Sequence, residues 1–338
     1  MTIMRQEIFV VTIYKFGFNR DSHRNKSPSE KRRRRRLRVK RFSQPHYISD
    51  SLIPAVASSF SASNREQQLA TIVASLHAAE IQHDIRKARM SAYIAEFIGT
   101  AILILLGNGV VANVVLDKTK GHAAGWIVIT AGWAMAVFTA VVCTADISGA
   151  HLNPAVTVGL ALNGLFAWGK LPGYIVAQLL GAFTGAIMVY ITYKNHYDAT
   201  EDPHAKLATF CTGPAIRNLP LNFFSEMIGT ALLVLAVFSF ANPDFPMPGD
   251  VSPTSIKVGL GSIGAVPVAA IVFAIGLSLG GTTGYAINPA RDLGPRLAHA
   301  ILPIRSKHDG DWSYAIIPIA GPIVGAVVAV ALFKLMHA

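Results

Sequence analysis

Residues 148–157 read Ser-Gly-Ala-His-Leu-Asn-Pro-Ala-Val-Thr, and residues 284–292 read Gly-Tyr-Ala-Ile-Asn-Pro-Ala-Arg-Asp. Both stretches place Asn at a helix N-cap and Pro at the first helical position, where a missing N–H does no harm. Each predicts a helix that begins an apolar run of about a dozen residues, or roughly 18 Å at 1.5 Å per residue. A bilayer core is about 30 Å thick, so neither helix can span it. Two half-length helices in corresponding parts of an apolar chain indicate a transport site near the middle of a membrane.

The composition is that of a protein with several membrane spans. Of the 338 residues, 52% are hydrophobic and 14% are charged, whereas soluble domains carry about 25% charged residues. The net charge of +11 lies in one part of the chain, because residues 1–89 hold 18 Lys and Arg against seven Asp and Glu. Residues 90–338 hold twelve of each kind, so the rest of the chain has no net charge.

The basic segment lies before the first apolar run. Residues 31–41 read Lys-Arg-Arg-Arg-Arg-Arg-Leu-Arg-Val-Lys-Arg, and blocks of like charge are usually disordered tails. The alternatives are binding to nucleic acid or to anionic lipid, or an upstream stretch that precedes a true start at Met90. We expect residues 1–89 to be a basic, disordered extension with no nucleic-acid partner, and residues 90–338 to form the membrane domain.

Six segments of 20 or more largely apolar residues predict membrane-spanning helices. They cover residues 92–115, 124–146, 171–194, 222–242, 254–280 and 312–336.

An internal repeat orders these spans. Residues 96–103 (Glu-Phe-Ile-Gly-Thr-Ala-Ile-Leu) match residues 226–233 (Glu-Met-Ile-Gly-Thr-Ala-Leu-Leu) at an offset of 130, and the Asn-Pro-Ala copies are 135 apart. Each half, about 90–195 and about 221–338, thus holds three spans and one half-helix. Because three is odd, the second half must enter from the opposite face, so the repeat is inverted. The predicted fold is all-α, with six transmembrane helices and two re-entrant half-helices.

Polar groups would meet where the half-helices begin. The positions concerned are Asn153, Pro154 and Ala155 in the first copy and Asn288, Pro289 and Ala290 in the second. Each Asn can cap its helix with the side-chain oxygen and donate from its NH₂ into a pore, while the preceding loops expose carbonyl groups. Such a row of donors and acceptors suits water or a polyol in single file. The two helix N-termini, each carrying about +0.5 charge, would repel cations and protons.

Three further polar residues flank these caps. Arg291 should face the pore or a partner, because a lipid-facing Arg costs about 2.5–3.5 kcal/mol or more; the alternative is an Arg that snorkels to the interface. Asp292 lies in the first helical turn, where a carboxylate suits the helix dipole. His151 either lines the pore with its backbone and ring or is a structural His, and no second His completes a metal site.

Glu96 and Glu226 occupy matching positions of the repeat, in the predicted first turns of spans one and four. We expect them to accept hydrogen bonds from the half-helix loops; the alternative is a pair of interfacial glutamates that mark where spans enter the membrane. The two cysteines, Cys143 and Cys211, lack metal-ligand spacing and a partner base. The sequence therefore predicts no metal, no cofactor and no enzyme.

At these residues the sequence resembles the major intrinsic proteins, the aquaporins and aquaglyceroporins, over about residues 90–338. The resemblance is carried by the stretch at 148–157, by Asn-Pro-Ala-Arg-Asp-Leu-Gly-Pro-Arg at 288–296 and by Gly-Pro-Ile-Val-Gly-Ala at 321–326. It implies a homotetramer in the lipid bilayer, with one pore in each subunit.

The resemblance also implies a narrow filter formed by four residues. Alignment on the two motifs places the filter at Trp133, Gly276, Tyr285 and Arg291. Water-selective members usually carry Phe and His at the first two positions, so Gly276 removes bulk. Trp133 and Tyr285 would form an aromatic corner opposite Arg291, as in the bacterial glycerol facilitators; the alternative is that both are lipid-facing or interfacial aromatics.

The predicted function is a passive channel for glycerol, other small neutral solutes and water that excludes protons and ions. A water-selective aquaporin is the alternative within the class, and Gly276 argues against it. A coupled secondary transporter would need intramembrane carboxylates that face the substrate. We expect a cell-membrane location with both termini in the cytoplasm, because six spans is even and the basic tail follows the positive-inside rule.

Overall fold

The computed structural model describes residues 91–240, 244–246, 255–257 and 260–338, so the predicted extension 1–89 lies outside the described residues. Six helical segments in this part are long and apolar enough to cross a membrane. They are Ser91–Val115, α3 (Trp126–Ser148), Trp168–Thr192, α8 (Leu219–Ser239), Gly261–Leu279 and α11 (Ile316–Met336). The third consists of a 3-10 turn (Trp168–Lys170) and α5 (Leu171–Thr192), and the fifth of a 3-10 turn (Gly261–Ala265) and α9 (Val266–Leu279). The predicted six-span helical fold is confirmed.

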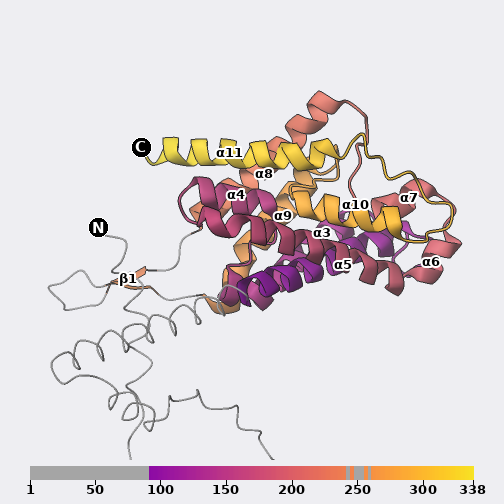
Figure 1. Ribbon diagram of the computed structural model, residues 1–338, viewed down its shortest axis with the longest axis horizontal. Coiled ribbons are helices and arrows are strands. Elements are labelled where there is room, and N and C mark those ends of the chain that lie inside the picture. The colour runs from indigo at the N-terminus through magenta and orange to yellow at the C-terminus, as the bar shows by residue number, and fades with distance from the viewer. Residues whose placement is uncertain (1–90, 241–243, 247–254, 258–259) are drawn as a thin grey trace, which may run out of the picture. The chain divides into compact units, whose positions relative to one another are not determined.

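Two helices are too short to span a membrane. The helix α4 (Pro154–Leu162) has nine residues and α10 (Pro289–Ile301) has 13, which correspond to about 14 and 20 Å. In Figure 1, α4 lies toward the end where α11 finishes, and α10 lies toward the end that carries α6 (Lys194–Ala199) and α7 (Pro203–Ala208). The half-helices thus lie toward opposite ends of the spans, as an inverted repeat requires.

Two predicted spans start a turn or more too early. The fifth span was expected from residue 254, but Ser255–Lys257 forms strand β2, which pairs antiparallel with β1 (Asp244–Pro246). The apolar pattern alone does not separate a short strand from the start of a helix. The sixth span begins at Ile316 rather than at residue 312, because Trp312 and its neighbours form a hydrogen-bonded turn.

Within each half, glycines let two spans approach closely. A Cβ added at Gly181 of α5 would lie 2.3 Å from the carbonyl oxygen of Phe97, and one at Gly325 of α11 would lie 2.3 Å from that of Met227. The first pair joins α5 to the helix Ser91–Val115, and the second joins α11 to α8. Small residues at helix crossings are the usual means of packing in lipid, where burial of apolar surface contributes little.

The half-helices connect the two halves. The helix α4 of the first half packs on α11 of the second, and α10 of the second half packs on α5 of the first. Glycines again lie where each half-helix meets the other half: a Cβ at Gly159 would lie 2.8 Å from Cγ1 of Val234 in α8, and one at Gly294 would lie 2.9 Å from the carbonyl oxygen of Leu179 in α5. Gly159 and Gly294 are 135 residues apart, like the two Asn-Pro-Ala copies. Each half-helix is therefore held by the half to which it does not belong.

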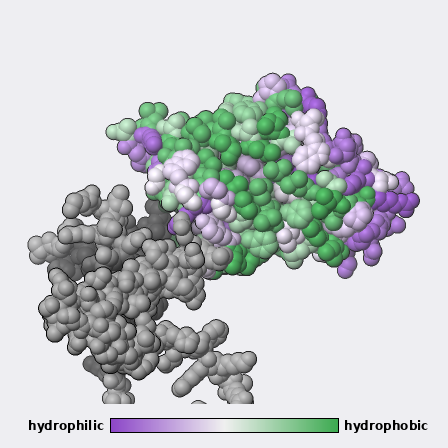
Figure 2. Space-filling model, viewed as in Figure 1, coloured by the Kyte–Doolittle hydropathy of each residue, from purple (hydrophilic) through white to green (hydrophobic). Residues whose placement is uncertain are grey.

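The surface separates into apolar and polar zones. Figure 2 shows hydrophobic residues over the middle of the described helices and hydrophilic ones around the end that carries α6 and α7. Large apolar side chains such as Ile127, Ile191 and Ile301 are 61–68% exposed, as expected of surfaces that face lipid. These features describe a multi-pass membrane protein.

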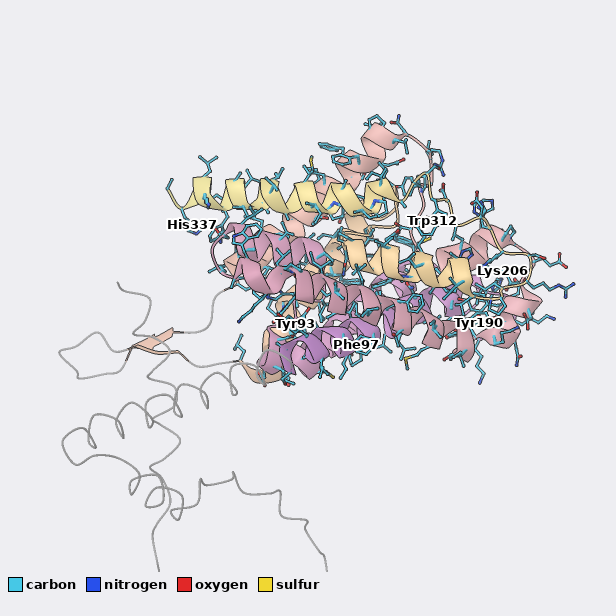
Figure 3. All side chains as sticks on the ribbon, in the orientation of Figure 1. Tyr93, Phe97, Tyr190, Lys206, Trp312 and His337 are labelled. Carbon is cyan, nitrogen blue, oxygen red and sulfur yellow. The ribbon has the colours of Figure 1, made fainter. Side chains whose placement is uncertain are left out.

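The loop after α10 is tied down at its polar end. Lys206 of α7 is buried and donates to the carbonyl oxygen of Arg305 at 2.7 Å, and the Tyr190 hydroxyl donates to that of Pro303 at 3.1 Å. Figure 3 shows Tyr190 and Lys206 at this end of the helices, and His337 at the other. The Lys307 ammonium group closes the helix, donating to the carbonyl oxygens of His299, Ala300 and Leu302 at 2.7–2.9 Å.

Candidate functional site

Both half-helices begin with the predicted cap, Asn153-Pro154 in α4 and Asn288-Pro289 in α10. The Asn153 side-chain oxygen accepts from the Ala155 N–H at 2.8 Å. The Asn288 oxygen accepts from the N–H groups of Ala290 and Arg291 at 3.0 and 3.2 Å. Each proline occupies a position whose N–H would have no partner within a helix, and each cap accepts from one or two of the N–H groups that follow.

The two caps are also joined to each other. The Asn153 amide donates to the carbonyl oxygen of Ile287 at 2.8 Å, and the Asn288 amide donates to that of Leu152 at 2.9 Å. This differs from the expectation that each NH₂ group donates into a pore. An amide nitrogen carries two hydrogens, so one N–H of each Asn remains after the cross-loop bond is made. The pairing is reciprocal because an approximate two-fold axis relates the halves.

The loops before the caps have an unusual backbone that is built twice. Ala150 and Leu152 have φ angles of 48° and 52°, and Tyr285 and Ile287 have φ angles of 38° and 43°. Residues other than glycine rarely adopt this left-handed backbone conformation, because it costs on the order of 1–3 kcal/mol per residue. It persists only where the surrounding structure imposes it. The two pairs are 135 residues apart, and all four residues line one cavity.

Glu96 holds the first loop in this conformation. Its carboxylate is fully buried and accepts from the Ser148 hydroxyl, the N–H groups of His151 and Leu152, and the Gln178 amide at 2.7–2.9 Å. A fully buried carboxylate with four donors does not fit the interfacial alternative.

Glu226 does the same for the second loop. It is 1% exposed and accepts from the Thr283 hydroxyl at 2.6 Å and from the N–H groups of Ala286 and Ile287 at 3.0 and 2.8 Å. The position equivalent to Gln178, three residues before the glycine that contacts the neighbouring span, is Pro322. Proline has no such donor. Gln178 was not predicted, although a glutamine within an apolar span is a visible signal.

His151 has both of the features proposed for it. Its ring lines the cavity, and its Nδ1 lies 3.2 Å from the Thr157 hydroxyl oxygen. The ring also packs against Phe166 and Tyr174, with centroid distances of 4.7 and 4.9 Å. The side chain of a residue that lines the cavity is therefore also fixed from several sides.

The cavity has a volume of about 210 Å³ and runs past the starts of both half-helices. Its polar lining comes from the loops, from Asn153 and Asn288, and from Arg291. Much of its remaining wall is aliphatic and includes Val137, Val141, Leu160, Val237, Val268 and Val272. The lining thus combines hydrogen-bonding groups with an aliphatic surface.

Arg291 and Trp133 lie together in this wall. The guanidinium carbon is 4.2 Å from the centroid of the Trp133 ring, so the two groups stack, a contact worth about 0.5–2 kcal/mol. This differs from the expected arrangement in which Trp133 stands opposite Arg291. Both side chains are buried, which excludes the snorkelling and lipid-facing alternatives for them. Among the described residues, Nη1 of Arg291 has no hydrogen-bond partner.

Gly276 is placed differently from the prediction. It does not line the cavity, whereas Tyr285 does. A Cβ added at Gly276 would lie 2.9 Å from both Cζ of Tyr285 and Cγ2 of Thr130. The missing side chain therefore makes room for the Tyr285 ring, and that ring, not an open space at Gly276, forms the wall.

Asp292 connects α10 to two loops on the polar side. It is fully buried; one oxygen accepts from the N–H and hydroxyl of Thr212 at 2.8 Å, and the other accepts from Nε of Arg296 at 2.8 Å. Arg296 also donates to the carbonyl oxygens of Thr212, Gly310 and Asp311. Asp292 is the residue after Arg291, so these hydrogen bonds restrain the start of α10 beside Arg291. Its partner Thr212 was not predicted.

Two half-helices that meet among six spans, beside a cavity lined by both polar and apolar groups, define a membrane channel. The chain belongs to the major intrinsic protein family, whose sequence profile it matches over residues 84–333. It is therefore a channel protein and not an enzyme.

Individual proteins agree with this assignment. The chain is 55% identical to a probable glycerol uptake facilitator protein of Thermotoga maritima, over 72% of this chain and 99% of that protein. It is 52% identical to a glycerol uptake facilitator protein of Streptococcus pneumoniae, over 73% of this chain and 99% of that protein. Its fold is similar to the crystal structure of the aquaglyceroporin from Plasmodium falciparum, with a TM-score of 0.63 and 32% identity over 74% of this chain and 97% of the other.

Proposed function

We propose that the protein is a passive channel that conducts glycerol, other small neutral solutes and water across the cell membrane. The observation that carries this proposal is the lining of a single cavity. It combines an aromatic surface from Trp133 and Tyr285 with a buried Arg291 whose Nη1 has no partner among the described residues. The names of the two bacterial relatives support the choice of glycerol.

The proposed passage of glycerol uses the two sides of the cavity differently. The guanidinium group of Arg291 donates to solute hydroxyls, and the carbon backbone slides along the rings of Trp133 and Tyr285. Further along, the remaining N–H groups of Asn153 and Asn288 donate while loop carbonyls accept. A hydroxyl left without a partner at this depth would cost about 1–3 kcal/mol. A continuous row of hydrogen-bonding groups along the cavity avoids this cost, so the free-energy barrier to glycerol permeation stays low.

The same positions exclude ions in this proposal. The starts of α4 and α10 each carry about +0.5 charge, and both caps face one cavity. Arg291 adds a full charge beside them. A cation or a protonated water chain would have to pass these fixed positive groups without its hydration shell.

A water-selective aquaporin and a coupled transporter are the remaining alternatives. A filter closed by imidazole would favour water alone, but here Gly276 accommodates the Tyr285 ring. A coupled transporter would need carboxylates that face its substrate. The carboxylates of Glu96 and Glu226 are instead occupied by hydrogen bonds from the half-helix loops.

We further propose a homotetramer with one pore per subunit, with both termini in the cytoplasm. The exposed apolar side chains of the spans need a cover of lipid or of another copy, which supports such an assembly. Residues 1–89, with their basic block at 31–41, are proposed to be an extension that precedes the channel domain and that binds no nucleic acid.

Stopped-flow light scattering of proteoliposomes tests the main proposal. Vesicles that contain the full chain are mixed with glycerol, urea, lactic acid or an impermeant osmolyte, and empty vesicles are the control. We expect fast re-swelling with glycerol and faster water loss than in empty vesicles. Glycerol permeability equal to that of empty vesicles, with water permeability raised, would favour the water-selective alternative.

A further inference from the structure

Trp126, the first residue of α3, contacts the channel wall from behind. Its ring meets the Tyr285 ring edge to face, with centroids 5.8 Å apart and an interplanar angle of 79°. Tyr285 lines the cavity, whereas Trp126 does not. Trp126 therefore touches a residue of the channel wall without lining this cavity itself.

A hydrogen bond fixes the Trp126 ring in this place. Its Nε1–H donates to the carbonyl oxygen of Gly276 at 2.9 Å. At the end of α9 the Gly280 N–H donates to Ile275 and not to Gly276, so the indole supplies a donor to the Gly276 carbonyl. Carbonyl groups near a helix C-terminus need such outside partners. This hydrogen bond both fixes the orientation of the indole and satisfies a carbonyl group near the C-terminus of α9.

Glycine packing restricts both rings further. A Cβ added at Gly280 would lie 2.5 Å from Cδ1 of Tyr285 and 2.8 Å from Cζ2 of Trp126. A Cβ at Gly276, one turn earlier, would meet Cζ and Cε2 of the same ring, so the two glycines leave the space in which the Tyr285 ring lies against the end of α9. Trp126 packs against the Tyr285 ring, so the ring has little room to move away from the pore.

The sequence carries this arrangement on one helix. Trp126, Thr130 and Trp133 follow at i, i+4 and i+7, which places them on one face of α3. Trp133 reaches the cavity, Thr130 lies against Gly276 of α9, and Trp126 contacts the Tyr285 ring. An interfacial Trp points its N–H toward water and headgroups, but this N–H points into the protein, to α9.

We propose that Trp126 is a positioning residue that sets the width of the channel: it holds the Tyr285 ring against α9 and so limits the size of polyol that passes. This inference rests on the proposed glycerol function and adds to it the residue behind the wall. Without the indole, the Tyr285 ring can move away from the pore and the channel becomes wider. The permeability of larger polyols should then increase relative to that of glycerol.

Three variants of the full chain test the proposal in proteoliposomes. Trp126→Leu removes both the ring contact and the hydrogen bond, and Trp126→Phe keeps an aromatic edge but removes the donor. Trp168→Leu is the matched control, because Trp168 is also an exposed Trp at the start of a span and has no contact with the filter residues among those described. The readout is the permeability ratio of erythritol, with four carbons, to glycerol, with three, at equal reconstituted protein.

We expect the ratio to rise roughly 2- to 10-fold in Trp126→Leu, the range that corresponds to an aromatic pair. A smaller rise is expected in Trp126→Phe and none in Trp168→Leu. A merely structural role would lower both fluxes equally and leave the ratio unchanged. An unchanged or lower ratio in Trp126→Leu overturns the proposal, and if that variant does not assemble, the ratio in Trp126→Phe decides in the same way. Absence of glycerol flux in the wild type would instead refute the proposed function.

Discussion

Substitution of Gly276 by alanine is the smallest change that should narrow this channel. The new methyl group would lie 2.9 Å from Cζ and 3.1 Å from Cε2 of Tyr285, and 2.9 Å from Cγ2 of Thr130. Carbon atoms in contact prefer about 3.5–4.0 Å. Thr130 belongs to α3, which packs against α9, so the Tyr285 ring is the group that can yield. It must shift by roughly 0.5–1 Å, toward the cavity that it lines.

The magnitude follows from the same contact. Overpacking by one methyl group typically costs about 1–3 kcal/mol. If the displaced ring raises the free-energy barrier for glycerol permeation by the same amount, glycerol permeability should fall roughly 5- to 150-fold. Water is smaller than glycerol, so it should be affected less. The glycerol-to-water permeability ratio should therefore fall, while the amount of assembled protein stays similar.

The assay is stopped-flow light scattering with glycerol and with an impermeant osmolyte, at equal protein density. Gly109→Ala is the matched control, because Gly109 also lies within a spanning helix and an added Cβ there meets nothing within 4 Å. We expect the control to behave as the wild type. An unchanged ratio in Gly276→Ala would show that Tyr285 does not form the narrow point, and the assignment of the channel wall would be wrong.

Four other results are expected. In Gly276→His with Tyr285→Cys, loss of the ring lets the imidazole reach the cavity, so glycerol flux should fall roughly 5- to 150-fold relative to water; equal loss of both fluxes would contradict this. Lys307→Met leaves the carbonyl groups at the end of α10 without their cation, so the midpoint of thermal unfolding in detergent should fall, in line with a loss of about 0.3–2 kcal/mol; the control is the exposed Lys120→Met, and equal midpoints would argue against the cap. Voltage-clamped oocytes should show no proton current, because Arg291 and two helix N-termini place positive charge along one path; a current comparable with the solute flux would refute it. A reporter fused to the C-terminus should read as cytoplasmic, and an external signal would exclude the six-span topology as oriented here.

Much of this fold follows from local chemistry that a sequence displays. Capping by Asn and the fixed φ of Pro act within three residues, so two Asn-Pro-Ala stretches are enough to predict where α4 and α10 begin. Span length and the odd number of spans in each half then predict the inversion. The buried acids Glu96 and Glu226 were found because both halves repeat them at one offset.

The details of the channel wall depend on contacts that no local pattern contains. The amide of Asn153 bonds a carbonyl 134 residues away, and the indole of Trp126 bonds one 150 residues away. The position of the Tyr285 ring depends on the backbone of Tyr285, whose φ angle is 38°. Hydrogen bonds from the Ala286 and Ile287 N–H groups to Glu226 hold this loop. From the sequence, the missing side chain of Gly276 predicts open space in the filter. In the structure the Tyr285 ring occupies that space, because protein interiors leave few voids of that size.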